Sequence, residues 1–406
     1  METTAIQVPS TAPWAEARAI HATLREHGAE AWLVGGCVRD LLLGRAVKDV
    51  DIATGASPEE IEQWFPRTVA VGKSFGVIIV VTPSKANVEV ASFRSDGAYI
   101  DGRRPTSIVP TDARSDVERR DFTINALLLD PLDGTVFDHV GGLADLRDRC
   151  LRAVGDAAAR LSEDRLRVLR ALRFAAGLGF AIEPRTWQAI RTTPLAGLSA
   201  ERIVQEWFKG LACARPGAWL RLLAESGRLA EVTPPLGQDL VAETATALDR
   251  LGPRDDEVAA AVWLSRVSVP AALAWLGGLP LEKASQRRIT WLIEQLRTLP
   301  RHHHAAIADR RRLAGHPQAE ALVAAARACL PDDSGQLAFV ADRAAERARP
   351  PFAPWVRASD LLALGLRPGP RVGVVLRRLE NAQLEGSLAD RDQALEQARI
   401  WLAGEA

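Results

Sequence analysis

A pair of aspartates one residue apart, preceded by a pair of glycines, is the part of this sequence with the clearest chemical meaning. The stretch LVGGCVRDLLLGRAVKDVDIAT spans residues 33–54 and contains Gly35, Gly36, Asp49 and Asp51. The letters DVDIAT predict a strand, on which residues i and i+2 project from one face, so the two carboxylates should lie a few ångströms apart. Like charges that close are destabilising unless a cation lies between them. The pair therefore predicts a Mg²⁺ site with Asp49 and Asp51 as ligands.

The two glycines predict a seat for phosphate groups. A short strand, residues 31–34, runs into Gly35 and Gly36, and the helical letters CVRDLLLG follow directly. Bare amides and the positive end of a helix favour an anion over the turn. Two metal ions about 3.5 to 4 Å apart could activate a hydroxyl and clamp a triphosphate. Taken alone, the glycines indicate a tight turn and the aspartates a solvated surface, but at this spacing they favour a nucleotide-handling catalytic centre.

Two further residues are candidates for the same centre. Glu89 lies in VEVASF, the second half of a hairpin predicted from residues 77–81 and 88–93, and is a possible third carboxylate. An outward, solvated position on an alternating strand explains Glu89 equally well. Arg39 lies one turn into the helix after the glycines, from where its side chain could reach a triphosphate.

The stretch EDRLRVLRALRF, residues 163–174, predicts a means of choosing bases. On a helix, Asp164 and Arg167 stand one turn apart and present an acceptor beside a donor. On the Watson–Crick edge, cytosine and adenine offer an amino donor beside a ring-nitrogen acceptor, whereas uracil and guanine offer a carbonyl beside an N–H, so the pair favours C and A. Each such contact is worth about 1 to 3 kcal/mol of discrimination. Arg170 and Arg173 rotate away around the helix, and we assign either to the triphosphate or to holding Asp164.

The same stretch has an ordinary structural role as well. Its leucines are spaced as the core stripe of an amphipathic helix, with arginines on the wet face. A second motif, RRDFTINA, begins at residue 119 and contains Arg120 and Asp121. Asp121 could accept a hydrogen bond from a ribose 2′-hydroxyl and so select ribonucleotides, or it could cap a helix.

Composition limits the class of protein and its surroundings. The 406 residues exceed one ordinary core, and 51 basic residues balance 51 acidic ones. Only five of the basic residues are lysine, and arginine suits phosphates and base edges, although a coding bias explains this equally well. Four scattered cysteines argue against a zinc site and a disulfide framework. No signal peptide or membrane span is evident, so we expect a soluble cytoplasmic protein.

The chain changes character near residue 145. Before it, helical and strand patterns mix, with a helix predicted over residues 13–26; after it, a helical pattern rich in Leu, Ala and Arg continues to the end. The expected fold is therefore α+β, an N-terminal head with a mixed sheet followed by an all-α remainder. The letters RARPPFAPW near residue 350 predict a linker.

These motifs resemble those of the class II tRNA nucleotidyltransferases, the CCA-adding enzymes and their poly(A) polymerase relatives in the DNA polymerase beta superfamily. Further motifs occur in the family's order: RRDFTINA, GGLADL, EDRLRVLRALRF and LSAERIVQE. The resemblance implies a polymerase-beta-like head over residues 1–146, a base-recognising neck over 147–212, a body over 213–295 and a tRNA-binding tail over 296–406.

The resemblance also implies an activity: template-independent addition of CCA to tRNA 3′ ends from CTP and ATP, with the protein acting as template. Asp49, Asp51 and Glu89 would be catalytic, with two Mg²⁺ ions bound. The loop over residues 93–105, which the family uses to change from CTP to ATP, argues against an enzyme that adds only CC. In the tail, Arg367 and Arg371 flank a Gly-Pro turn that either binds RNA phosphate or merely caps a helix.

Alternatives remain open from the sequence. An A-adding enzyme that works beside a CC-adding partner is the first, and a poly(A) polymerase is the second, although VGKSFGVIIV is more similar to the tRNA enzymes. An inactive RNA-binding protein on the same scaffold is the third, against which the presence of Asp49 and Asp51 argues. The chain is expected to be a monomer or a homodimer.

Overall fold

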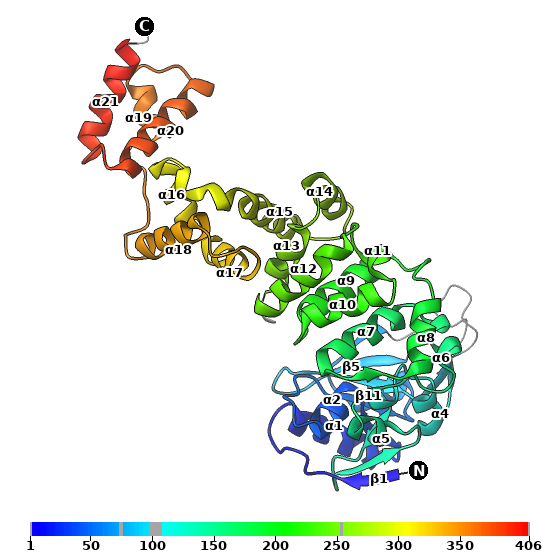
Figure 1. Cartoon of the computed structure of the whole chain (residues 1–406). Helices are drawn as coiled ribbons and strands as arrows, with labels where there is room; N and C mark the ends of the chain where they lie inside the picture. Colours follow the sequence, from blue (N-terminus) through cyan, green and yellow to red (C-terminus); the bar gives the residue numbers. More distant parts are fainter. Residues whose placement is uncertain (1, 73–75, 97–107, 252–254, 405–406) are drawn as a thin grey trace. The chain divides into compact units, whose positions relative to one another are not determined.

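The protein consists of two compact units, residues 1–233 and residues 234–406 (Figure 1). The computed structural model describes residues 2–72, 76–96, 108–251 and 255–404. Residues 97–105 of the loop predicted to change nucleotide specificity therefore lie outside the described residues. The first unit holds the mixed sheet and all the residues predicted to handle nucleotide.

One eight-stranded mixed sheet forms the centre of the first unit, as predicted. Strands β3 and β6 pair in parallel, and every other neighbouring pair in the sheet is antiparallel. The predicted hairpin is confirmed as β5 and β6. In sheet order the strands are β1 (Glu2–Ala5), β10 (Thr135–Asp138), β9 (Leu127–Leu129), β2 (Ala31–Val34), β3 (Asp51–Thr54), β6 (Asn87–Ser92), β5 (Val77–Val81) and β4 (Thr68–Gly72).

Short helices connect these strands, and longer helices follow them in the first unit (Figure 1). Beside the sheet lie α1 (Trp14–Glu26), α2 (Gly36–Leu42), α3 (Pro58–Trp64), α4 (Ala113–Glu118), the 3₁₀ helix η2 (Thr123–Asn125) and α5 (Gly142–Arg147). After them come α6 (Ala157–Glu163), α7 (Leu166–Leu178), α8 (Pro184–Thr192), α9 (Ala200–Leu211), α10 (Pro216–Glu225) and α11 (Leu229–Val232). Leu169 and Leu172 of α7 are fully buried, which confirms the predicted core stripe.

Two expectations about the region after residue 145 were wrong in detail. The region is not free of strands, because β11 (Cys150–Leu151) pairs in parallel with β12 (Ala181–Ile182). Residues 163–174 do not form one helix, because the chain is extended at Asp164, between α6 and α7. The Asp164 carboxylate accepts a hydrogen bond from the Leu166 amide and so caps the start of α7. Another short antiparallel pair, β7 (Arg94–Asp96) and β8 (Ile108–Pro110), lies apart from the main sheet.

The second unit is helical throughout its described residues. It contains α12 (Gln238–Leu251), α13 (Asp256–Leu264), α14 (Val269–Gly277), α15 (Lys283–Thr298), η3 (Leu299–His304), α16 (Ile307–Ala314), α17 (Ala319–Cys329), α18 (Ser334–Arg347), α19 (Ala358–Ala363), α20 (Pro370–Glu385) and α21 (Arg391–Gly404). The predicted linker near residue 350 is confirmed as a non-helical segment between α18 and α19. The last three helices share their own core, in which Leu361, Leu379 and Ala398 are buried.

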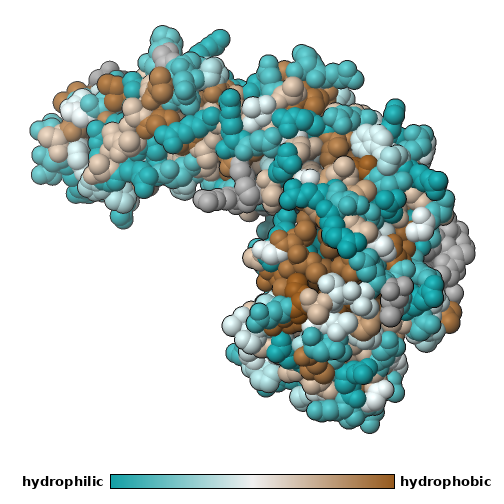
Figure 2. Space-filling view, turned by 60° about the horizontal axis from the view of Figure 1, so that its bottom comes forward, coloured by the Kyte–Doolittle hydropathy of each residue, from teal (hydrophilic) through white to brown (hydrophobic). Residues whose placement is uncertain are grey.

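The surface and the cysteines agree with the composition. Hydrophilic residues predominate on the face shown in Figure 2, and hydrophobic residues gather there in separate patches. All four cysteines are free thiols, as expected. Within the part of the chain that the structure describes, no helix has the length and apolar character needed to cross a membrane.

Candidate active site

The glycine turn brings three predicted residues together. Gly35 follows β2 with φ +81° and ψ −140°, a backbone conformation that residues other than glycine rarely adopt. A Cβ atom built on Gly35 would lie 3.7 Å from Nη1 of Arg120 and 3.8 Å from Oδ2 of Asp51. The side chains of Arg120 and Asp51 therefore both lie close to the backbone of the turn at Gly35.

Asp51 carries the strongest electrostatic signal in this group. Burial, then the negative charges of Glu89 and Asp49, raise the pKa of Asp51 to about 6, although Arg120 opposes them. Ile52 of β3 lies opposite Val90 of β6 in the parallel register, and both are buried. Asp51 and Glu89 each precede these partners, so they share the opposite face of the sheet. Excess negative charge on one face is what a cation would relieve.

Asp49 differs from the prediction. Strand β3 begins at Asp51, so Asp49 lies just before the strand, where it is exposed. In the described parts of the chain, no group of three or more His, Cys, Asp or Glu side chains is gathered closely enough to form a complete metal site. The donor chemistry nonetheless fits a hard cation, because Glu89 and Asp49, which are carboxylates like Asp51, are close enough to raise its pKa.

A buried aspartate that sequence reasoning missed fixes the arginines of RRDFTINA. Asp116, on α4, is 1% exposed and accepts hydrogen bonds from Arg119 and Arg120. Burial alone would raise the pKa of Asp116, but Arg120 and Arg119 hold it below its ordinary value. Its position three and four residues before the arginines on a helix was the available signal. Asp116 thus aims Arg120 at the glycine turn.

Arg39 and Asp121 lie on opposite sides of one asparagine. Arg39 is 7% exposed; it donates to Asn125 Oδ1 at 2.6 Å and forms a two-pronged ion pair with Asp40. Asp40 therefore ties this arginine in place. Asn125 in turn donates to Asp121 at 3.1 Å. The chain of contacts joins α2 to the segment that precedes β9.

Asp121 also holds an arginine from the base-recognition stretch. Arg170 donates to Oδ2 of Asp121 from Nη2 at 2.7 Å and from Nε at 3.0 Å. Burial opposes ionisation of Asp121, but Arg170 and Asn125 together keep the pKa of Asp121 below its ordinary value. Asp121 is therefore a carboxylate at neutral pH and can accept hydrogen bonds.

Asp164 and Arg167 each have a partner that fixes their position. Both Asp164 oxygens accept from Arg202, at 3.0 and 2.8 Å. Arg167 donates to Glu163 and to the carbonyl oxygens of Arg160 and Arg119. The assignment of Arg170 or Arg173 to holding Asp164 was wrong, because Arg202 does so from α9. The motif LSAERIVQE contains Arg202, but a separation of 38 residues gave no reason to pair it with Asp164.

One cavity of about 390 Å³ collects most of these side chains. It is lined by Gly35, Gly36, Arg39, Asp51, Arg119, Arg120, Asp121, Asn125, Asp164, Arg167, Arg170 and Phe174. Asp49, Glu89 and Arg173 are not among the lining residues. Arg173 instead donates to Glu206 at 2.7 Å. Asn125, Arg119 and Phe174 were not predicted, although Phe174 ends the EDRLRVLRALRF stretch.

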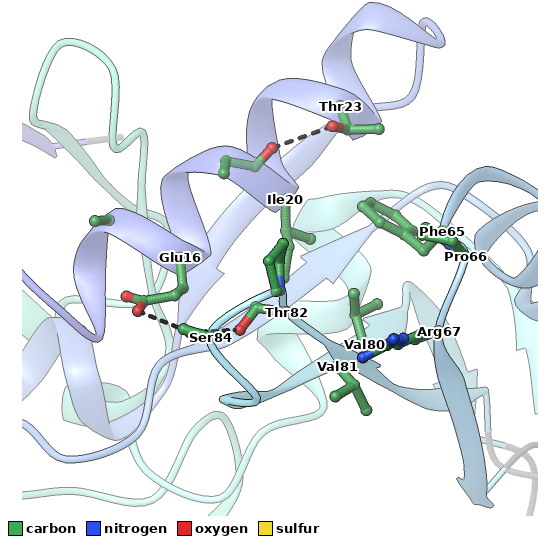
Figure 3. Close-up of a pocket in the computed structure, with 13 residues that line it drawn as sticks. Glu16, Ile20, Thr23, Phe65, Pro66, Arg67, Val80, Val81, Thr82 and Ser84 are labelled. Carbon is green, nitrogen blue, oxygen red and sulfur yellow. Dashed lines mark hydrogen bonds between the residues drawn. The ribbon is translucent and has the colours of Figure 1, made fainter.

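A larger cavity, of about 750 Å³, lies elsewhere in the first unit. Figure 3 shows it between α1, the turn around Pro66, and the end of β5. Its lining is mainly apolar; Glu16 accepts a hydrogen bond from Ser84 at its rim. None of the predicted site residues lines it. The smaller cavity is the candidate active site, because only it combines paired charges with the glycine turn.

The sequence and the fold were compared with those of known proteins. The family model described as "Poly A polymerase head domain" matches residues 31–152, and "Probable RNA and SrmB- binding site of polymerase A" matches residues 179–239. The CCA-adding enzyme of Bacillus licheniformis is 38% identical over 394 residues, which cover 93% of this chain and 95% of that protein. The chain belongs to the family of CCA-adding enzymes. Members of this nucleotidyltransferase family generally use divalent metal ions.

Two further relatives give the extent of the likeness. The CCA-adding enzyme of Geobacillus stearothermophilus is 48% identical over 220 residues, and this match spans 54% of that relative and 53% of this chain. The crystal structure of the Bacillus stearothermophilus CCA-adding enzyme in complex with CTP has a TM-score of 0.82 and 29% identity, and the match covers 97% of this chain and 100% of that one. The likeness in fold therefore extends over both units.

Proposed function

We propose that this protein adds CCA to the 3′ ends of tRNA without a nucleic-acid template, using CTP and ATP and releasing pyrophosphate. The observation that carries the proposal is the position of Asp51. Its carboxylate has a pKa raised to about 6 by burial and by Glu89, and its Oδ2 lies 3.8 Å from the position that a Cβ atom on Gly35 would take. It shares one cavity with Asp164 and Arg167. Metal-binding, phosphate-binding and base-reading chemistry thus converge on one site.

The reaction forms a bond between the tRNA 3′-oxygen and the α-phosphorus of the nucleotide. The bond from that phosphorus to pyrophosphate breaks, and the hydroxyl proton is lost. Two Mg²⁺ ions held by Asp49 and Asp51 would supply activation of the hydroxyl and neutralisation of the phosphates. Glu89 adds negative charge beside Asp51.

The chain's own residues orient the nucleotide. We assign the amides of Gly35 and Gly36 and the guanidiniums of Arg39 and Arg120 to the triphosphate, because all four residues line the cavity. Asp121, which is ionised, accepts the ribose 2′-hydroxyl and so favours ribonucleotides. Arg170 supports Asp121 and adds positive charge on the same side. Preorganised charges of this kind stabilise the transition state without having to reorient.

Asp164 and Arg167 select the base. Arg202 holds the Asp164 carboxylate from behind, and Glu163 holds Arg167. The pair thus keeps a fixed spacing of acceptor and donor, which complements cytosine and adenine and opposes uracil and guanine. Arg173 acts at a distance from the base, through its ion pair with Glu206.

The helical parts of the chain bind the tRNA. We assign residues 1–146 to the head, 147–212 to the neck, 213–295 to the body and 296–406 to the tail. Arg367 and Arg371 lie on either side of Gly369 at the start of α20, and both are exposed. We assign them to contacts with RNA phosphates, which dominate shape-based recognition of double-stranded RNA.

Three tRNA substrates test this function. The purified protein is incubated with tRNA that ends before C74, after C74 or after C75, with labelled CTP and labelled ATP supplied separately. A CCA-adding enzyme incorporates CMP into the first two and AMP into the third. An enzyme that adds AMP to the third substrate but CMP to none of the three is A-adding, and one that extends any RNA with many adenylates is a poly(A) polymerase; either result overturns the proposal.

A further inference from the structure

One aromatic ring lies among three arginines at the candidate active site. The guanidinium carbons of Arg39, Arg170 and Arg173 lie 5.1, 5.2 and 4.4 Å from the centroid of the Phe174 ring. Each distance falls within about 6 Å, where the ring's negative face attracts a cation. Phe174 also lines the cavity. A single ring therefore connects the helix after the glycine turn, α2, with the base-selecting helix, α7.

A carboxylate fixes the outer side of each arginine. Arg39 pairs with Asp40 at 2.8 Å, Arg170 with Asp121 at 2.7 Å, and Arg173 with Glu206 at 2.7 Å. The carboxylates and the ring together offset the mutual repulsion of three like charges held around one point.

The ring itself is held by the core. Phe122, which is fully buried, packs edge-on against Phe174 with ring centroids 5.9 Å apart and an interplanar angle of 78°. Phe122 directly follows Asp121, the partner of Arg170. The ring is therefore rigidly supported on one side and meets the arginines on its others.

We propose that Phe174 is a positioning residue, whose ring orients Arg39 and Arg170 for the sugar-triphosphate part of the nucleotide. The proposal rests on the proposed function for the identity of the nucleotides. The base-reading Arg167 is held separately, by Glu163 and by backbone carbonyls. Loss of the ring should therefore weaken the binding of CTP and of ATP to the same extent and leave the choice of base unchanged.

The replacement Phe174→Leu tests the role, because leucine keeps apolar bulk and removes the ring's charge distribution. We expect KM for CTP and for ATP to rise about tenfold together, kcat to change less than about threefold, and KM for tRNA to stay constant. Phe174→Tyr keeps the ring and should restore KM. The matched control is Phe180→Leu, a buried phenylalanine just beyond the end of α7, for which KM should stay at the wild-type value.

Three results would overturn the role: unchanged KM values in Phe174→Leu, a tyrosine variant as impaired as the leucine variant, or an equal rise in Phe180→Leu. Equilibrium binding of CTP and ATP to the same variants separates this inference from the function. A wild-type protein that binds both nucleotides but adds neither to tRNA contradicts the proposed function. The ratio of dissociation constants between wild type and Phe174→Leu then still decides the role of the ring.

Discussion

At the scale of single residues, the site is a set of charges whose positions are fixed by oppositely charged partners, two of them far away in the sequence. Asp164 depends on Arg202, Asp121 on Arg170, and both arginines of RRDFTINA on Asp116. These ion pairs are half-buried, so removing one partner leaves the other charge poorly solvated. The pairs explain how a compact cavity keeps several like charges close together.

The raised pKa of Asp51 predicts how stability depends on pH when divalent ions are absent. Because its pKa rises from about 3.8 to about 6 on folding, the folded protein binds more protons than the unfolded chain between these values. The contribution of Asp51 to the free energy of unfolding should therefore fall as pH rises from about 4 to about 6. Relative to wild type, Asp51→Asn should gain up to about 3 kcal/mol over this range.

Urea unfolding in the presence of EDTA, at about pH 4 and about pH 7.5, measures this difference. At each pH, the free energy of unfolding of wild type is subtracted from that of Asp51→Asn, and the two results are compared. Any effect of the asparagine side chain that does not depend on pH cancels in this comparison. A difference between the variant and the wild type that stays the same at both pH values would contradict the assignment.

Arg202 should govern base selection without contacting the base. Replacing Arg202 by Gln frees the Asp164 carboxylate, so we expect the preference for CTP over UTP, as a ratio of kcat/KM, to fall about tenfold. Arg185→Gln, at an exposed arginine of α8, is the matched control and should keep the ratio. Retention of the wild-type ratio in Arg202→Gln would show that Asp164 needs no such support.

Sequence reasoning found the charged residues but not their partners. Gly35, Asp51, Asp164 and Arg167 could be predicted, because each belongs to a motif whose residue types suit one chemistry. Their neighbours could not, since Arg202 and Asp164 are 38 residues apart and only the packing of α9 against α7 brings them together. The residues of the site could be predicted because each lies in a short motif. Their positions relative to one another depend on tertiary structure.

At the scale of elements, the strand-turn-helix around Gly35 and the break before α7 determine where the charges point. The hairpin could be predicted because both of its runs are rich in β-branched residues, and the leucine stripe of α7 because its apolar residues repeat at a period of 3.6. Strand β1 was missed because its letters ETTA are all exposed and show no alternation. The break at Asp164 was missed because the leucine pattern continues past it.

Replacing Gly35 by alanine should lower the free energy of unfolding, whereas the same replacement at a glycine within a helix should not. The φ of +81° at Gly35 makes Gly35→Ala cost about 1 to 3 kcal/mol. The matched control is Gly177→Ala within α7, where the added Cβ would make an ordinary 3.6 Å contact with Cys213. That change should be neutral or stabilise by up to about 1 kcal/mol. Denaturant titration of both variants gives the two values, and an equal effect of both would contradict the conformational argument.

At the scale of the whole molecule, the chain divides the work between two units. The first unit contains the cavity and the residues that we assign to binding metal and phosphate and to reading the base. The second contains the arginines that we assign to tRNA. Such a division predicts that changes in the second unit alter the use of tRNA and spare the binding of nucleotide.

The arginines near α20 allow this to be measured. The double variant Arg367→Gln, Arg371→Gln should raise KM for tRNA and reduce the slope of log KM against log salt by about one for each RNA phosphate that the variant no longer neutralises. The control is Arg327→Gln, Arg347→Gln, at exposed positions of α17 and α18, which should keep the wild-type slope. Equal slopes in both double variants would remove Arg367 and Arg371 from the RNA-binding surface.

The central claim is that Asp51 anchors the divalent ions that drive nucleotide addition. The most direct test is the single-turnover rate of CMP addition to tRNA at saturating CTP and Mg²⁺, compared between wild type and Asp51→Asn. Asp133→Asn, at an exposed turn aspartate, is the matched control. We expect the rate to fall at least about a thousandfold in Asp51→Asn, with tRNA binding unchanged. A rate within about threefold of wild type would contradict the account.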